Sequence, residues 1–102
     1  MAEILKQKEL EKALGELNEV ADAAPWQVID GKLTKEFKFK NFIHAFGWMT
    51  QMAIWAEKLK HHPEWFNVYN KVKVDLVTHD AGGISDLDFQ LAKKMELYKV
   101  KD

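Results

Sequence analysis

Short segments in which apolar and polar residues alternate predict two β-hairpins. In residues 26–40 the alternation reverses at Asp30-Gly31, a pair that favours the positive φ angles of a tight hairpin turn. In residues 65–78 it reverses at Asn70-Lys71. Successive side chains of a strand point to opposite sides, and most apolar side chains of each return strand fall on one face. We therefore expect an antiparallel sheet with one face covered and the other open to water.

Apolar residues at spacings of three and four predict three helices. The first covers residues 3–21, and the second begins after Asn41, which can cap it, and runs to about Lys60. Ser85 with Asp88 resembles a capping box, in which each residue bonds the backbone of the other, and it opens the last helix. The sequence thus predicts a chain that combines helices with an antiparallel sheet.

The second helix is apolar on two separate stripes. The Phe42 stripe consists of Phe42, Phe46, Met49, Ala53 and Ala56. The Trp48 stripe consists of Trp48, Met52, Trp55 and Leu59, about 110° further around the axis. Because a chain of this length builds one modest core, we expect the Trp48 stripe to be buried against another copy of the chain. Coverage of that stripe by the first and third helices is the alternative.

Composition narrows the classes of partner. The length indicates a single domain, residues 1–102. The net charge of -1 creates no electrostatic field that would attract nucleic acid or an anionic membrane. All 15 basic residues are lysine, so the guanidinium fork that reads guanine edges is missing. Cysteine is absent, and no apolar run approaches the ~20 residues of a membrane span. We expect a cytoplasmic protein that binds neither nucleic acid directly nor membrane.

Three of the four histidines are expected to meet at one end of the sheet. His61 and His62 leave the second helix just before Pro63, and His79 ends the strand that returns from the second hairpin turn. Imidazole has an ordinary pKa of about 6.5, so it gives and takes protons near neutrality. Their convergence indicates acid and base chemistry. His44 lies on a polar arc of the second helix, where we expect a solvated side chain.

A metal site built from the three histidines is the rival interpretation, since such ligand sets bind catalytic zinc. Adjacent residues of an extended segment point apart, and the sequence contains neither HxxxH nor CxxC spacing. We therefore favour a site without metal. Glu57 and Asp80 flank the histidines and could orient an imidazole or simply be solvated.

Aromatic residues near the histidines could stack on a flat heterocycle. They are Trp65, Phe66 and Tyr69. The alternation of the strand places at least one of them in the core instead.

The chain resembles the pterin-4a-carbinolamine dehydratase family at these residues. EKLKHHPEWFNVYNKV and then THD follow the order and spacing of the family signature, and FKFKNFIHAFGWM extends the resemblance. It covers the chain from about Trp26 to the last helix. The resemblance implies an α+β fold in two layers, a four-stranded antiparallel sheet with three helices on one face. It also implies a homodimer or homotetramer, formed by helix packing and sheet extension.

The resemblance implies a lyase without metal or organic cofactor. It would dehydrate 4a-hydroxytetrahydrobiopterin to quinonoid dihydrobiopterin and so recycle tetrahydrobiopterin. We expect His61, His62 and His79 to be catalytic, with His61 and His79 transferring protons and His62 orienting the substrate. Lys60 stands where animal members carry an acidic residue, so its backbone is the expected contact. The implied substrate contacts are Glu57, Lys60, His61, His62, Pro63, Val77, Thr78, His79 and Asp80.

A different class of function is a binding module. In mammals the family also serves as a dimerisation cofactor of a homeodomain transcription factor, which implies a coactivator that is also nuclear. The Trp48 stripe would then pack against a helix of the partner. A regulator that binds a heterocycle without turning it over is a third reading of the same histidines.

Overall fold

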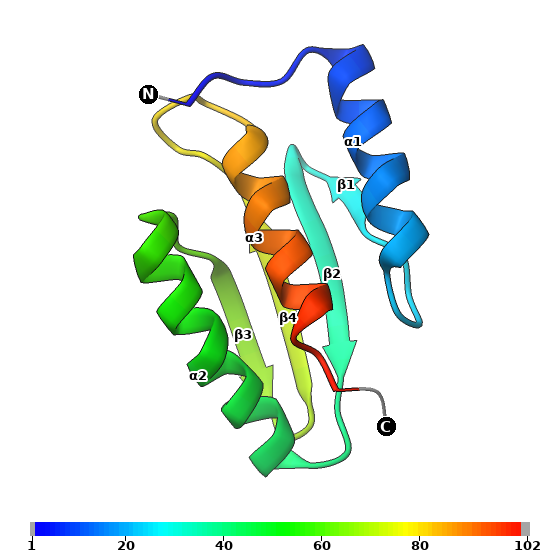
Figure 1. Ribbon diagram of the computed structural model, residues 1–102, viewed down its shortest axis with the longest axis vertical. Helices are drawn as coiled ribbons and strands as arrows, with labels where there is room; N and C mark the ends of the chain where they lie inside the picture. Colours follow the sequence, from blue (N-terminus) through cyan, green and yellow to red (C-terminus); the bar gives the residue numbers. More distant parts are fainter. Residues whose placement is uncertain (1, 101–102) are drawn as a thin grey trace.

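Four antiparallel strands form one layer of the protein, and three helices cover one face of it (Figure 1). The computed structural model describes residues 2–100, and Met1, Lys101 and Asp102 lie outside the described residues. The strand order is β1-β2-β4-β3, which confirms the predicted α+β fold. The elements are α1 (Gln7–Val20), β1 (Gln27–Ile29), β2 (Lys32–Lys38), α2 (Phe42–Leu59), β3 (Glu64–Val68), β4 (Lys71–Leu76) and α3 (Asp86–Leu97).

Both hairpin turns use residues with positive φ. Asp30 and Gly31 have φ angles of 52° and 76°, as their sequence predicts. The second turn lies at Tyr69 and Asn70, one residue earlier than predicted, and Tyr69 has a φ of 50°. The turn is set there because the Asn70 side chain donates to the carbonyl of Phe39 at 3.0 Å, and the amide of Phe39 donates back to the carbonyl of Asn70.

The central strands β2 and β4 supply the sheet's contribution to the core. Leu33 pairs with Leu76 and Phe37 with Val72, and all four side chains are buried under the helices. Residues of the opposite parity form the outer face of the sheet, which is not covered by α1, α2 or α3 (Figure 1). Among residues 2–100 no helix is long and apolar enough to cross a membrane.

The prediction for the two stripes of α2 was wrong, and their roles are exchanged. Trp48 and Met52 are buried, and Trp55 stacks on Tyr98 with ring centroids 5.8 Å apart. The indole of Trp48 donates to the carbonyl of Met95 at 3.1 Å, so α3 fixes the rotation of α2. The alternative, in which other helices of the same chain cover the Trp48 stripe, therefore describes the structure, with α3 as the covering helix.

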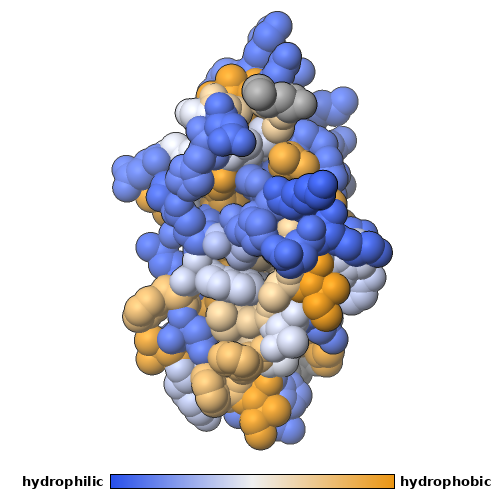
Figure 2. All heavy atoms as spheres, turned by 90° about the vertical axis from the view of Figure 1, so that its left-hand side faces the viewer, coloured by the Kyte–Doolittle hydropathy of each residue, from blue (hydrophilic) through white to orange (hydrophobic). Residues whose placement is uncertain are grey.

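The Phe42 stripe faces outward instead. Phe42 and Phe46 are 49% and 54% exposed, although Ala56 of the same stripe is buried. Ile43 and Ile54, which belong to neither stripe, widen the exposed apolar surface. Figure 2 looks at the molecule from the side of α2 and shows apolar residues gathered in its lower half.

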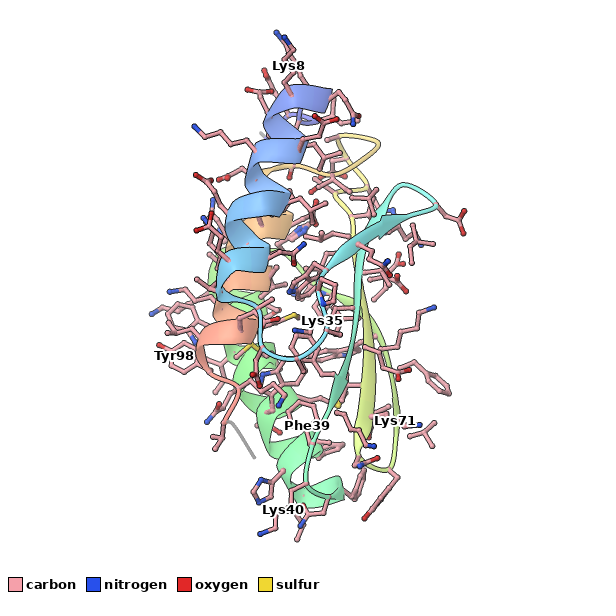
Figure 3. All side chains as sticks on the ribbon, turned by 90° about the vertical axis from the view of Figure 1, so that its right-hand side faces the viewer. Lys8, Lys35, Phe39, Lys40, Lys71 and Tyr98 are labelled. Atoms are coloured by element: carbon pink, nitrogen blue, oxygen red, sulfur yellow. The ribbon has the colours of Figure 1, made fainter. Side chains whose placement is uncertain are left out.

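A buried ion pair ties the sheet to the last helix. Lys35, labelled in Figure 3, is the one charged residue on the inner face of β2, and its ammonium lies 2.5 Å from a carboxylate oxygen of Glu96. The same oxygen of Glu96 accepts from the indole of Trp26, and the other accepts from the backbone of Asp22. Lys35 also donates to the carbonyl of Asp22, so every partner in this network is satisfied.

We predict that Lys35→Met lowers the free energy of unfolding by about 3–5 kcal/mol, because it leaves the carboxylate of Glu96 buried without its counter-charge. Urea unfolding followed by tryptophan fluorescence measures the change. Lys38→Met removes an exposed lysine from the same strand and is the control, with an expected change below about 0.5 kcal/mol. Equal losses in the two variants would contradict a specific role for the buried pair.

Candidate functional site

A cleft of about 770 Å³ opens where α2 ends, β4 ends and α3 begins. These three segment ends lie in the upper half of Figure 1. Ala2 and Glu3 of the segment before α1 complete its wall. Seven of the nine substrate contacts expected from the sequence line this cleft: Lys60, His61, His62, Val77, Thr78, His79 and Asp80. Glu57 and Pro63 do not line it.

The end of α2 sends two adjacent histidines into different surroundings. Lys60 adopts the left-handed conformation, with φ 53° and ψ 42°, and the amide of His61 donates to the carbonyl of Ala56 at 3.0 Å. Pro63 has no amide hydrogen and cannot continue the helix. As a result His61 is only 8% exposed, whereas the side chain of His62 is 63% exposed.

A buried carboxylate holds the ring of His61. Asp88 is fully buried on the first turn of α3, and one of its oxygens lies 2.5 Å from Nε2 of His61. Its other oxygen accepts from the hydroxyl of Thr78 at 2.8 Å and from the amide of Ser85 at 2.9 Å. A carboxylate that already receives two donors acts as an acceptor for the third. His61 therefore donates from Nε2, and Nδ1 carries the lone pair whenever the ring is neutral.

The loop between β4 and α3 is fixed by the same group of contacts. The hydroxyls of Thr78 and Ser85 lie 2.6 Å apart, and Ser85 caps α3 in the capping box with Asp88 that the sequence predicts. The amide of Thr78 donates to the carbonyl of Gly83 at 2.8 Å. A Cβ at Gly83 would lie 2.4 Å from the terminal carbon of the Ile4 side chain, so a larger residue there would displace that side chain. The loop therefore presents His79 from a defined backbone.

Carboxylates also approach the other two histidines of the cleft. Nε2 of His62 lies 2.5 Å from Glu57, and Nε2 of His79 lies 2.9 Å from Glu64, the first residue of β3. The other carboxylate oxygen of Glu64 receives the ammonium of Lys32 at 2.6 Å. Each of the three imidazoles thus has a carboxylate at Nε2, which leaves Nδ1 as the nitrogen without that contact.

Electrostatics make Glu64 an acceptor in this arrangement. The hydrogen bond from Lys32, followed by that from His79, lowers the pKa of Glu64, and the hydrogen bond to Glu64 raises the pKa of Lys32. Glu64 is therefore a carboxylate near neutrality, and the shared hydrogen belongs to Nε2 of His79.

The aromatic residues considered as stacking partners lie elsewhere. Trp65 packs toward the core, with its ring centroid 6.4 Å from that of Trp48. Phe66 points from the exposed outer face of β3, and Tyr69 forms the hairpin turn. None of them lines the cleft, so stacking by these side chains is not available there. His44, on the first turn of α2, is also absent from the cleft.

Two carboxylates of the site were not predicted. Asp88 was recognised only as a helix cap, although full burial of a charged residue is uncommon unless it is paired. Glu64 has the parity of the outer face, and the sequence offers no signal that it reaches His79.

Among residues 2–100, no group of three or more His, Asp or Glu side chains is arranged to hold a metal ion.

Imidazoles paired with carboxylates in a cleft are suited to an enzyme that works by general acid–base catalysis. Residues 3–98 match the family described as pterin 4 alpha carbinolamine dehydratase. The chain therefore belongs to this family, which confirms the resemblance seen in the sequence. Membership makes it an enzyme of the lyase class, a dehydratase.

Relatives of similar length support this assignment. A protein of Solibacter usitatus named as a pterin-4-alpha-carbinolamine dehydratase is 53% identical over 92 residues, covering 90% of each chain. One of Rhizobium leguminosarum with the same name is 56% identical and covers 90% of this chain and 92% of its own. A crystal structure from Brucella melitensis, called a transcriptional coactivator/pterin dehydratase, is 45% identical with a TM-score of 0.85. The match covers 95% of this chain and 99% of that one.

We predict that Asp88→Asn lowers the dehydratase kcat about tenfold or more, because an amide cannot accept all three donors and no longer fixes the hydrogen of His61 on Nε2. Steady-state kinetics below the melting temperature measure the change.

The matched control is Ser85→Ala. It weakens the same helix start by about 1 kcal/mol but leaves the contact between Asp88 and His61 in place. Its kcat should stay close to that of the unaltered protein. Equal losses of kcat in both variants would assign the effect to the helix cap and would contradict a role for Asp88 in catalysis.

Proposed function

We propose that this enzyme converts 4a-hydroxytetrahydrobiopterin to quinonoid dihydrobiopterin and water, and so recycles tetrahydrobiopterin after aromatic amino-acid hydroxylation. The observation that carries the proposal is the meeting of His61, His62 and His79, from two separate segments, around one cleft. The family narrows the substrate to a pterin carbinolamine. The volume of the cleft falls within the range of about 300–1,000 Å³ that is typical of small-molecule sites.

The reaction asks for one acid and one base. The bond between C4a and the hydroxyl oxygen breaks, the leaving oxygen takes a proton, and N5 gives one up, so the elements of water leave without change of oxidation state. We assign the two proton transfers to His61 and His79 and the orientation of the pterin to His62. The scheme needs no redox cofactor, because no electron is gained or lost, and we propose that the imidazoles act without a metal ion.

Carboxylate contacts support the assignment of His61 and His79 to proton transfer, whereas burial separates only His61 from His62, since the side chains of His79 and His62 are 73% and 63% exposed. His61 is enclosed and held by Asp88, and His79 is held by Glu64, so each keeps one nitrogen for the substrate. His62 and its partner Glu57 are both largely exposed. The remaining proposed contacts with the pterin are Lys60, Val77, Thr78 and Asp80, mainly through backbone or edge groups, with Glu57 and Pro63 acting through the histidines beside them.

We predict that His61→Ala and His79→Ala each lower kcat by about 10²–10⁴-fold, the usual contribution of acid or base catalysis. His62→Ala should chiefly raise KM. The measurement is the appearance of quinonoid product in ultraviolet absorbance after mixing the protein with freshly made 4a-carbinolamine.

His44→Ala is the control for these variants, since His44 lies on the first turn of α2 and outside the cleft. Its rate should match that of the unaltered protein. Unchanged dehydration in all three cleft variants would remove the assignment. Binding of the pterin without turnover by the unaltered protein would instead favour the regulator.

We also propose that the exposed apolar surface of α2 joins copies of this chain into a homodimer or homotetramer. The surface consists of Phe42, Ile43, Phe46 and Ile54. Exposed apolar patches of this kind commonly mark interaction sites. The Brucella melitensis structure is called a transcriptional coactivator as well as a pterin dehydratase. If this chain also acts as a coactivator in a nucleus, we propose that the helix of its transcription-factor partner binds the same surface. The cytoplasm is the proposed location of the recycling reaction.

We predict that Phe46→Glu reduces self-association, because it places a charge in the middle of this surface. Sedimentation equilibrium over a range of concentrations measures it. Phe66→Glu, at an exposed position on the other layer, is the control for the added charge. An unchanged oligomeric state in the Phe46 variant would contradict the proposed interface. If the unaltered protein is monomeric at every concentration, a partner helix remains as the proposed ligand of this surface.

A further inference from the structure

His79 differs from His61 in how its ring is held. Its backbone belongs to a tight turn, in which Ala81 donates to the carbonyl of Thr78 and Gly82 donates to that of His79 itself. The side chain is 73% exposed, so packing does not select its rotamer. Any fixed orientation of this imidazole therefore has to come from a polar contact.

Glu64 supplies that contact from the other side of the sheet. It opens β3 opposite Asp75 of β4, and its side chain has the parity of the outer face. One carboxylate oxygen meets Nε2 of His79 at 2.9 Å, and the other meets the ammonium of Lys32, the first residue of β2, at 2.6 Å. Lys32 and Glu64 lie on strands that are not neighbours, because β4 runs between them.

We propose that Glu64 is a positioning residue for His79, and that Lys32 holds the carboxylate of Glu64 in place for this task. The proposal rests on the proposed function, in which His79 transfers a proton. Glu64 acts in two ways: it selects one rotamer of an exposed ring, and it keeps the hydrogen on Nε2 so that Nδ1 is the nitrogen that exchanges a proton with the substrate.

The charge of Lys32 keeps Glu64 suited to this role. A protonated Glu64 could donate to His79 and reverse the tautomer, but Lys32 lowers the pKa of Glu64 and so preserves the acceptor. Lys32 also occupies the oxygen that His79 does not use, which limits rotation of the carboxylate. Asp75, the cross-strand neighbour of Glu64, is itself engaged by the hydroxyl of Thr34 at 2.6 Å.

The first test is kinetic and uses a double-mutant cycle. We expect Glu64→Ala to lower kcat about two- to fivefold, the scale of an exposed charged contact, with KM changed less than kcat. Lys32→Met should give a smaller loss in the same direction. In a His79→Ala background, Glu64→Ala should have no further effect, because a residue that acts through His79 has nothing left to position.

Glu36→Ala is the matched control, since Glu36 is an exposed carboxylate on the same face of the sheet and pairs across the strands with Lys73. It should leave kcat unchanged in both backgrounds. An undiminished kcat in Glu64→Ala, or the same loss with and without His79, would overturn the proposal.

The second test does not depend on turnover. Nitrogen-15 spectra of the imidazole of His79, recorded where the ring is neutral, should show predominantly the tautomer with hydrogen on Nε2. Glu64→Ala should mix the two tautomers, and Glu64→Gln, which keeps an oxygen acceptor, should partly restore the original one. An unchanged tautomer in Glu64→Ala would overturn the proposal. Absence of dehydration by the unaltered protein would instead overturn the proposed function.

Discussion

Three donors converge on the buried carboxylate of Asp88: the ring of His61, the hydroxyl of Thr78 and the amide of Ser85. These groups belong to the exit from α2, the exit from β4 and the entry to α3. The cleft lies among these three segments, so its shape depends on the distances that Asp88 sets. Burial of a charge is costly unless its acceptors are filled. The site is therefore most rigid around the fully buried carboxylate of Asp88.

The carboxylate contact of His61 is buried, and it holds the ring more firmly than the exposed contacts hold His62 and His79. His61 is enclosed with a buried partner, whereas His62 and His79 are largely exposed and bond carboxylates that also meet water. A charged contact in water contributes less than one in the interior. One wall of the cleft is therefore held by a buried contact, whereas the orientation of His62 and His79 depends on carboxylate contacts that water weakens.

Local patterns predict most of the fold and the gathering of the histidines. Alternation and the Asp30-Gly31 turn define the hairpins, and an antiparallel hairpin returns His79 to the end of the sheet where His61 and His62 leave α2. Orientation of α2 could not be predicted in this way, because both of its stripes are apolar. The choice between them depends on the bond from Trp48 to Met95, 47 residues away. Glu64 was missed for the same reason, since its partners come from two other segments.

The segment before α1 has a consequence for handling the protein. The amide of Leu5 donates to the carbonyl of Ile84, Ile4 lies against Gly83, and Ala2 and Glu3 reach the wall of the cleft. Any affinity tag or fluorescent fusion joined ahead of Ala2 would start beside the mouth through which the pterin enters. The chain leaves α3 at the far end of the molecule (Figure 1), where an attached label would be well separated from incoming substrate.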